Sequence, residues 1–269
     1  MQDDTPDTDL SRHALCVRDV SLGYADRTIL TNVDFCVDAG EIVTILGGSG
    51  SGKSTLLKSI IGLLPPRKGE IYVYGSRISG SGSEESLLYA RKRIGVLFQS
   101  GALIGSMTVA ENVALPILEF SNVPREIAAD IVRLKLEMVK LGRFGDFYPS
   151  ELSGGMKKRA GLARAMALDP QILFCDEPSS GLDPVISAEM DQLLLELNRS
   201  LGITIVVITH DLPSIKTISD WSIMLDGGAR GVIARGTPEE LENSPDPRVR
   251  RFFRRQSENG GLSASGGDA

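Results

Sequence analysis

The feature that most constrains the fold of this chain is a glycine-rich loop at residues 47–54, with the sequence GGSGSGKS. It fits the pattern GxxxxGK[ST] and lies between an apolar, strand-like run at 41–46 and a helix-like run that begins near Lys53. Glycines let the backbone turn tightly, so that its N–H groups point inward and surround phosphate oxygens. The dipole of the following helix adds to this attraction for anions. The segment therefore predicts a strand, a phosphate-binding loop and a helix.

Two side chains of this loop are expected to bind the charged groups of a nucleotide. Lys53 should reach the β- and γ-phosphates, and Ser54 should ligate Mg²⁺. The residues expected to contact ATP in this segment are Gly47, Gly48, Ser49, Gly50, Ser51, Gly52, Lys53, Ser54 and Thr55.

The order of the other elements predicts an α/β protein with a mostly parallel sheet, because strand-like runs alternate with helical runs along most of the chain. The expected strands cover residues 14–20, 28–37, 41–46, 70–75, 93–99, 172–176, 203–208, 221–225 and 232–235. The expected helices cover 54–64, two stretches between 106 and 150, the segment after Ser153, and 184–199.

The domain boundaries follow from where this alternation begins and stops. Residues 1–13 are polar and acidic, and we expect a disordered lead there. We expect one domain over 14–244, in which about 100–165 forms an α-helical subdomain. Residues 245–269 form a C-terminal extension, and its last part, rich in Gly and Ser, is expected to be disordered.

A pair of carboxylates follows another apolar strand, at the end of ILFCD. Asp176 ends this strand, where its carboxylate can hold Mg²⁺ beside Ser54, directly or through water. Glu177 comes next, near the expected position of a γ-phosphate, and could polarise an attacking water molecule. Acidic pairs are also common at helix starts, so this pair alone is weak evidence for a metal site. It indicates a nucleotide site only together with the glycine-rich loop.

Histidine and cysteine are scarce in this chain. His210 follows an apolar strand at its carboxyl end, where α/β sheets place ligands, whereas His13 lies in the polar lead and should be solvated. The cysteines Cys16, Cys36 and Cys175 form no CxxC pair. We therefore expect neither a disulfide nor a zinc site. We expect three inert thiols in a reducing cytosol.

The composition excludes some classes of protein. The net charge is −6, without the basic surplus that is usual for nucleic-acid binding, so we expect no nucleic-acid partner. No apolar run approaches the ~18 residues of a membrane span, and the acidic N-terminus is unlike a signal peptide. We therefore expect a cytoplasmic protein. If it acts at a membrane, another molecule must bring it there.

Further motifs, in order along most of the chain, resemble those of the ABC ATPase family. The distinguishing one is LSGGM at 152–156, which is similar to the signature LSGGQ of that family. In the family, the signature of one subunit closes over ATP held by the phosphate-binding loop of another. The resemblance assigns this role to Ser153, Gly154 and Gly155. It also implies the α/β fold of a P-loop NTPase, with an N-terminal antiparallel β subdomain and an α-helical signature subdomain. Ser153 could also be an ordinary helix cap.

The resemblance extends to single residues. It implies that Tyr24 stacks on adenine and that Gln99 senses Mg²⁺ and couples to a membrane subunit. It also implies that Asp183 lies in a loop crossing the dimer interface and belongs to the ATP-binding residues. It also makes His210 the switch histidine that contacts the γ-phosphate. The catalytic residues that it implies are Lys53, Glu177 and His210. The expected metal-binding residues are Ser54, Gln99 and Asp176. Since the chain carries one set of motifs, a homodimer is expected.

Two strings indicate which transporter this is. FQSGALIGSMTVAENVALP and ELSGGMKKRAGLARAMALDP, the latter including Met156, resemble the ATPases of Mla/Mce lipid-transport systems. That resemblance implies a permease dimer, an Mce-domain lipid-binding protein, a small STAS-domain protein, and a place at the cytoplasmic face of the inner membrane. The function it implies is phospholipid movement between the inner and outer membranes. A different cargo, a soluble ABC ATPase acting on DNA or the ribosome, and a non-catalytic regulatory subunit are the alternatives.

The C-terminal segment PDPRVRRFFRR at 245–255 has two interpretations. Its five arginines around two phenylalanines could form a docking helix for an acidic partner or a membrane surface. They could equally form a solvated amphipathic helix that caps the domain.

Overall fold

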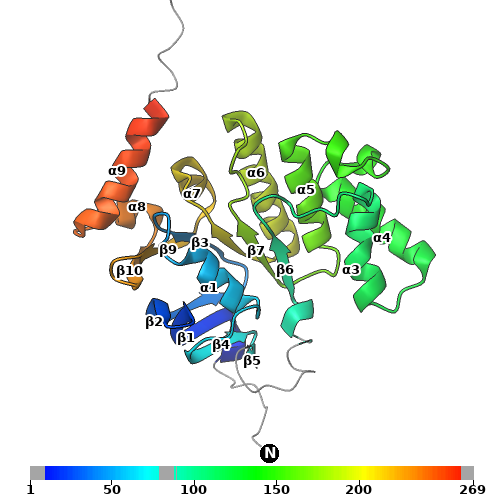
Figure 1. Ribbon diagram of the computed structural model, residues 1–269. Helices are drawn as coiled ribbons and strands as arrows, with labels where there is room; N and C mark the ends of the chain where they lie inside the picture. Colours follow the sequence, from blue (N-terminus) through cyan, green and yellow to red (C-terminus); the bar gives the residue numbers. More distant parts are fainter. Residues whose placement is uncertain (1–9, 79–87, 89, 262–269) are drawn as a thin grey trace, which may run out of the picture.

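Two β-sheets lie on either side of helix α1 (Lys53–Ile60) in the computed structural model (Figure 1). The structure describes residues 10–78, 88 and 90–261. Leu56, Leu57 and Ile60 of α1 belong to a buried core to which both sheets contribute. The expected α/β fold, with its N-terminal antiparallel sheet and its helical subdomain, is confirmed.

The N-terminal sheet is antiparallel, and its strands within the described residues run in the order β2-β1-β4-β5. Its bounds are β1 (His13–Tyr24), β2 (Arg27–Asp38), β4 (Lys68–Val73) and β5 (Ser76–Arg77). A 3-10 helix, η1 (Leu10–Arg12), leads into it.

The second sheet carries the candidate site. Its described strands run in the order β10-β9-β3-β8-β7-β6, and all neighbours are parallel except β10 and β9. Its bounds are β3 (Ile42–Leu46), β6 (Ile94–Leu97), β7 (Ile172–Asp176), β8 (Thr204–Ile208), β9 (Trp221–Asp226) and β10 (Gly231–Gly236). Alternate residues of a strand face opposite sides of the sheet. In β7, Phe174 accordingly packs in the α1 core, while Leu173 and Cys175 pack against the helices of the other face.

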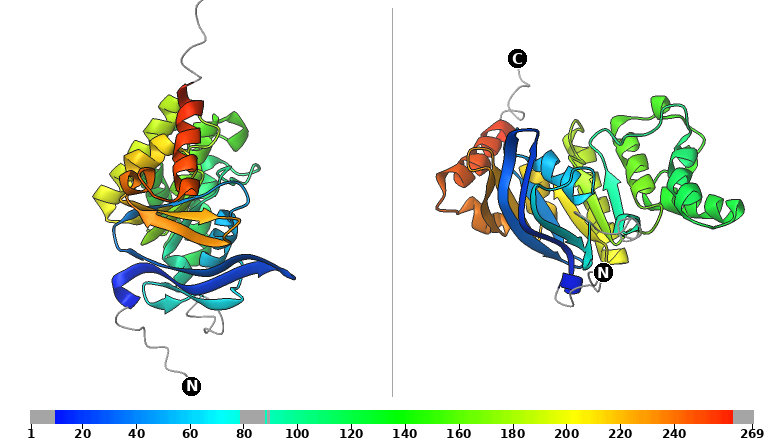
Figure 2. Two further views of the ribbon diagram at one scale, coloured as in Figure 1. Left: turned by 90° about the vertical axis from the view of Figure 1, so that its left-hand side faces the viewer. Right: turned by 60° about the horizontal axis from the view of Figure 1, so that its bottom comes forward.

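The chain between β6 and β7 is helical, as predicted for the two stretches between 106 and 150, and it forms one end of the molecule (Figure 2). Its described elements are α3 (Val109–Phe120), α4 (Arg125–Met138), η2 (Gly142–Phe144), η3 (Pro149–Glu151) and α5 (Gly154–Ala165). Thr108 and Glu111 form a capping box that fixes the start of α3. Asn112, with no exposed surface, holds the loop before α3 through hydrogen bonds to backbone atoms of Ile104, Met107 and Thr108.

The remaining helices follow the later strands. They are α6 (Pro184–Leu201), α7 (Leu212–Ile218), α8 (Pro238–Glu242) and α9 (Pro247–Gly261). Val249 and Phe253 bury α9 in a third core with Leu212 and Met224. Within the described residues, no helix is both long and apolar enough to span a membrane.

The prediction of disorder at the two ends is wrong for the residues nearest the domain. Leu10–Arg12 forms η1 and His13 begins β1, although a disordered lead was expected over 1–13. At the other end, α9 continues through Gly261, into the Gly/Ser-rich tail. Residues 1–9 and 262–269 lie outside the described residues.

The expectations for His13 and for two of the cysteines are also wrong. Cys16 and Cys36 face each other across β1 and β2 and are joined in a disulfide. Neither sulfur is therefore free to bind a metal. An irregularity in the pairing between His13 and Leu15 brings His13 opposite Asp38, to which its ring is hydrogen-bonded. Only Cys175 is a free, buried thiol among the described residues.

Candidate functional site

The glycine-rich loop joins β3 to α1 as predicted, and its conformation explains two of its glycines. Gly47 has φ +147°, and a Cβ atom there would lie 2.5 Å from the Leu225 carbonyl oxygen. Gly52 has φ +100°, and its Cβ would meet the side chain of Leu30. Lys53 folds back over the loop, where its Nζ donates to the carbonyl oxygens of Gly47 and Gly48 at 2.7 and 3.0 Å.

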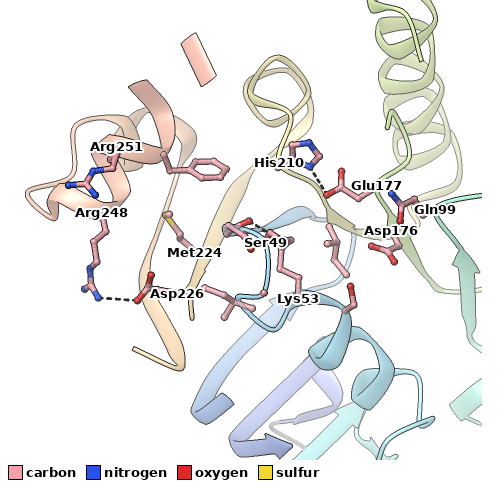
Figure 3. Close-up of a pocket in the computed structure, with 17 residues that line it drawn as sticks. Ser49, Lys53, Gln99, Asp176, Glu177, His210, Met224, Asp226, Arg248 and Arg251 are labelled. Carbon is pink, nitrogen blue, oxygen red and sulfur yellow. Dashed lines mark hydrogen bonds and ion pairs between the residues drawn. The ribbon is translucent and has the colours of Figure 1, made fainter. Parts of the chain in front are cut away.

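A cavity of about 770 Å³ opens above this loop, at the carboxyl ends of the parallel strands (Figure 3). That is large enough for a nucleotide-sized ligand. Its lining brings together many of the residues singled out in the sequence, namely Gly47, Gly48, Ser49, Gly50, Lys53, Ser54, Gln99, Asp176, Glu177 and His210.

The charges in the cavity act on one another. Burial lowers the pKa of Lys53, and the negative charges of Glu177 and Asp176 oppose that shift. Burial also raises the pKa of Asp176, as does the neighbouring charge of Glu177, while Lys53 and Lys58 act in the opposite direction. A cation bound between these carboxylates would relieve the cost of placing them together.

Glu177 has an unusual backbone and one carboxylate oxygen without a partner. Its φ is +50°, a left-handed conformation that is rare for residues other than glycine and is found where a functional side chain must be aimed. Its Oε1 lies 2.7 Å from Nδ1 of His210. Its Oε2 is buried and has no hydrogen-bond partner within the described part of the chain. One acceptor position of the Glu177 carboxylate is therefore unused.

Other predicted site residues lie outside the cavity lining. Tyr24 ends β1, and its side chain is 46% exposed. Ser51 belongs to the glycine-rich loop but is buried. Gly52 and Thr55 belong to the start of α1 and also do not line the cavity.

The signature residues lie on a different part of the chain, at the start of α5. Ser153 caps this helix by accepting a hydrogen bond from the Met156 N–H at 3.3 Å, and both it and Gly154 are exposed. A Cβ on Gly155 would lie 2.7 Å from the side chain of Ile186, so close packing against α6 requires this glycine. Asp183 caps α6 by accepting from the N–H groups of Val185 and Ile186.

Two features of the site were missed by sequence reasoning. Lys158 is buried on α5, and its Nζ donates to the carbonyl oxygens of Glu177 at 2.9 Å and Ser180 at 2.6 Å. It thus ties helix α5 to the segment that follows β7, yet in the sequence it looks like any helix lysine. The second feature is the wall formed by β9 and α9 (Figure 3), where the lining residues are Met224, Leu225, Asp226, Arg248, Arg251 and Phe252.

The arginines of α9 were noticed in the sequence, but their place beside the cavity was not. Arg248 forms ion pairs with Asp226 at the end of β9 and with Asp246. These bonds, and the buried Val249 and Phe253, fix the first turns of α9 to the domain, as expected of a capping helix.

Comparison with known proteins identifies the family. The profile of the ABC transporter family matches residues 30–180. The chain belongs to the ABC transporter family. It is 43% identical over 237 residues to the intermembrane phospholipid transport system ATP-binding protein MlaF of Escherichia coli K12, covering 88% of this chain and 87% of MlaF. It is 42% identical to a probable ribonucleotide transport ATP-binding protein, mkl, of Mycobacterium leprae, covering 89% of this chain and 68% of mkl.

Solved structures agree with this ABC assignment. The cbiO1 protein of Clostridium perfringens, part of the transporter complex cbiONQ, superposes with a TM-score of 0.78 at 30% identity, over 94% of this chain and 99% of cbiO1. A dimer of the ATP-binding cassette MJ0796, bound to ADP and phosphate, gives a TM-score of 0.75 at 32% identity, over 83% of this chain and 98% of that one. This ABC protein is accordingly an ATP-hydrolysing transporter subunit.

Proposed function

We propose that this chain hydrolyses MgATP as a head-to-tail homodimer, in which each site combines the cavity of one copy with the α5 start of the other. The observation that carries the proposal is the separation of two sets of residues within one chain. Lys53, Asp176, Glu177 and His210 line the cavity, whereas Ser153 and Gly154 are exposed on α5 and do not line it. The dimeric state of the MJ0796 cassette, which is similar to this chain, supports the arrangement.

The residues of the cavity fit Mg²⁺ and the phosphates of ATP. Ser54 offers an exposed hydroxyl, and Asp176 a carboxylate, on the same cavity wall. Oxygen donors of this kind suit Mg²⁺, and Gln99 would complete the set. When bound, Mg²⁺ would neutralise negative charge on the phosphates. Lys53 would bind the β- and γ-phosphate oxygens, and Tyr24 at the end of β1 would stack on adenine.

Glu177 is the general base of the proposed reaction. Its carboxylate, which lines the cavity, would accept a proton from the attacking water, whose oxygen bonds to the γ-phosphorus as the bond to ADP breaks. His210, held by Oε1 of the same carboxylate, would contact the γ-phosphate. The partner copy's signature would contact this phosphate from the opposite side with a helix N-terminus, which attracts anions.

The membrane permease would bind in a second cavity, of about 540 Å³, between β6, α3 and α5. Its wall includes the partly exposed side chains Phe98 and Phe120, and apolar surface of this kind is typical of a protein-binding groove. Phe98 directly precedes Gln99, which lines the nucleotide cavity. Contact with a permease could therefore change the position of Gln99.

Phospholipid is the cargo that we propose, with the ATPase held by its permease at the cytoplasmic face of the inner membrane. The similarity to MlaF supports this choice over ribonucleotides, which the name of mkl suggests, because MlaF matches over the larger share of its own length. An Mce-domain lipid-binding protein and a small STAS-domain protein are the further partners that we propose. Purification of tagged protein from membranes, with identification of the bound chains and lipids, tests the cargo. An unrelated permease without phospholipid would overturn it.

Glu177→Gln tests the reaction itself. The amide keeps the shape of the side chain but is a poor base, so ATP should still bind and hold the dimer together while hydrolysis falls by about two to four orders of magnitude. Glu196→Gln, at an exposed position of α6, is the matched control and should leave turnover unchanged. Near-normal turnover of Glu177→Gln would remove Glu177 from the role of base.

A further inference from the structure

A buried carboxylate, Asp191, lies behind the switch histidine, on the face of α6 that packs against α7. Only 4% of its surface is exposed. It lines a cavity of about 520 Å³ that Glu177, His210 and Asp211 also line. None of the family motifs found in the sequence includes Asp191, and buried carboxylates are rare unless paired.

Asp191 is joined to Asp211 through one hydroxyl group. Ser214 Oγ lies 2.9 and 2.7 Å from the two carboxylate oxygens of Asp191, and 3.0 Å from Oδ2 of Asp211. A serine hydroxyl has a single proton to donate. It can serve one of the two carboxylates, so the contact with the other is a hydrogen bond only if that carboxyl carries a proton.

The surroundings indicate that Asp191 holds this proton. Asp211 is less buried than Asp191, and Ser214 itself is 1% exposed. Burial raises the pKa of Asp191 to about 6, and the charge of Asp211 acts in the same direction against the Ser214 hydrogen bond. Glu177 and His210 are the other titratable groups in the cavity. Cations on the helices that pack against α6 have other partners. Lys158 of α5 donates to the carbonyl oxygens of Glu177 and Ser180. Arg159 of α5 pairs with Glu189, and Lys216 of α7 pairs with Glu242.

The bridge connects two elements that begin at the proposed catalytic interface. The N-cap of α6 is Asp183, in the loop expected to cross the dimer interface, and the N-cap of α7 is Asp211, directly after His210. Asp211 makes no side-chain capping bond to α7. Its carboxylate is bound to Ser214 instead, so the state of the bridge bears directly on the backbone next to His210.

We propose that Asp191 is a positioning residue for His210, holding the segment 210–211 through Ser214 and Asp211 when it is protonated and releasing it when it is ionised. The inference rests on the proposed role of His210 in hydrolysis. With Asp191 ionised, two carboxylates compete for one hydroxyl proton and repel each other, and the bridge loosens.

Asp191→Asn separates this role from simple packing. The amide has nearly the shape of a protonated carboxyl and can donate to Ser214 Oγ at every pH. The turnover number of the variant should match that of the wild type at pH 5.5 and exceed it by about threefold at pH 8, with the KM for ATP within about twofold. Because both proteins share Glu177 and His210, any effect of pH that is common to the two proteins cancels in the ratio.

Two controls keep the outcomes apart. Gln192→Ala changes an exposed residue in the same cavity wall, and its ratio to the wild type should not vary with pH. His210→Ala should be nearly inactive at both pH values. An Asp191→Asn ratio that is constant with pH while His210→Ala is inactive would overturn the positioning role alone. If His210→Ala keeps the wild-type rate, the proposed role of His210 in hydrolysis is wrong, and the positioning role of Asp191 is refuted with it.

Discussion

Replacing Asp191 by Asn should stabilise the protein in a way that depends on pH. Burial raises the pKa of this carboxyl from an ordinary 3.8 to about 6. The folded protein therefore holds the proton more tightly than the unfolded chain. The stability that this proton contributes is fully present below pH 3.8 and is lost as the pH rises through about 6. From the difference between the two pKa values, the wild type at pH 8 has lost about 3 kcal/mol of the stability that this proton contributes at low pH. At pH 5 it has lost about half of that amount.

The assay is urea unfolding of the wild type and of Asp191→Asn at pH 5 and at pH 8. The free energy of unfolding gained by the variant should be about 1.5 kcal/mol larger at pH 8 than at pH 5. Comparing the two gains removes the constant effect of replacing an oxygen atom by an amino group. Asp26→Asn, in an exposed turn, is the control and should shift stability by less than about 0.5 kcal/mol at both pH values. An Asp191→Asn gain that is equal at both pH values would refute the raised pKa.

Two further substitutions test parts of the molecule that hold the site together. Lys158→Met removes both hydrogen bonds from Nζ to the carbonyl oxygens of Glu177 and Ser180, so the turnover number should fall by about tenfold or more in steady-state kinetics. Unchanged turnover would mean that the carboxylate does not depend on this lysine. Asn112→Ala leaves buried backbone groups of the loop before α3 without partners, and it should lower the free energy of unfolding by about 2–4 kcal/mol in urea. A loss below about 1 kcal/mol would show that water replaces the amide.

Most of the cavity above the glycine-rich loop could be predicted because its residues follow strands of one parallel sheet. The carboxyl ends of β3, β7 and β8 lie at the same edge, so the glycine-rich loop, Asp176 and His210 had to meet there. Periodicity and motif spacing were enough to place them. The helical insert was equally clear, because two amphipathic stretches follow each other without a strand.

What could not be predicted depends on contacts between segments that are far apart in the sequence. The irregular pairing after His13 decides which face of β1 each side chain occupies, and nothing in the alternation of residues 13–16 marks it. The disulfide of Cys16 with Cys36 follows from that register. Lys158 and Asp191 look like ordinary polar helix residues until the packing of α5, α6 and α7 buries them.

The central claim is that each ATP site is shared between two copies of this chain, and mixed dimers test it most directly. Lys53→Ala disables the cavity, and Ser153→Arg blocks the exposed start of α5. In a dimer with one copy of each variant, one site would carry both defects and the other would be intact. Dimers isolated with a different tag on each copy should hydrolyse ATP at roughly half the wild-type rate, while each variant alone is nearly inactive. Mixed dimers no more active than either variant would contradict a shared site.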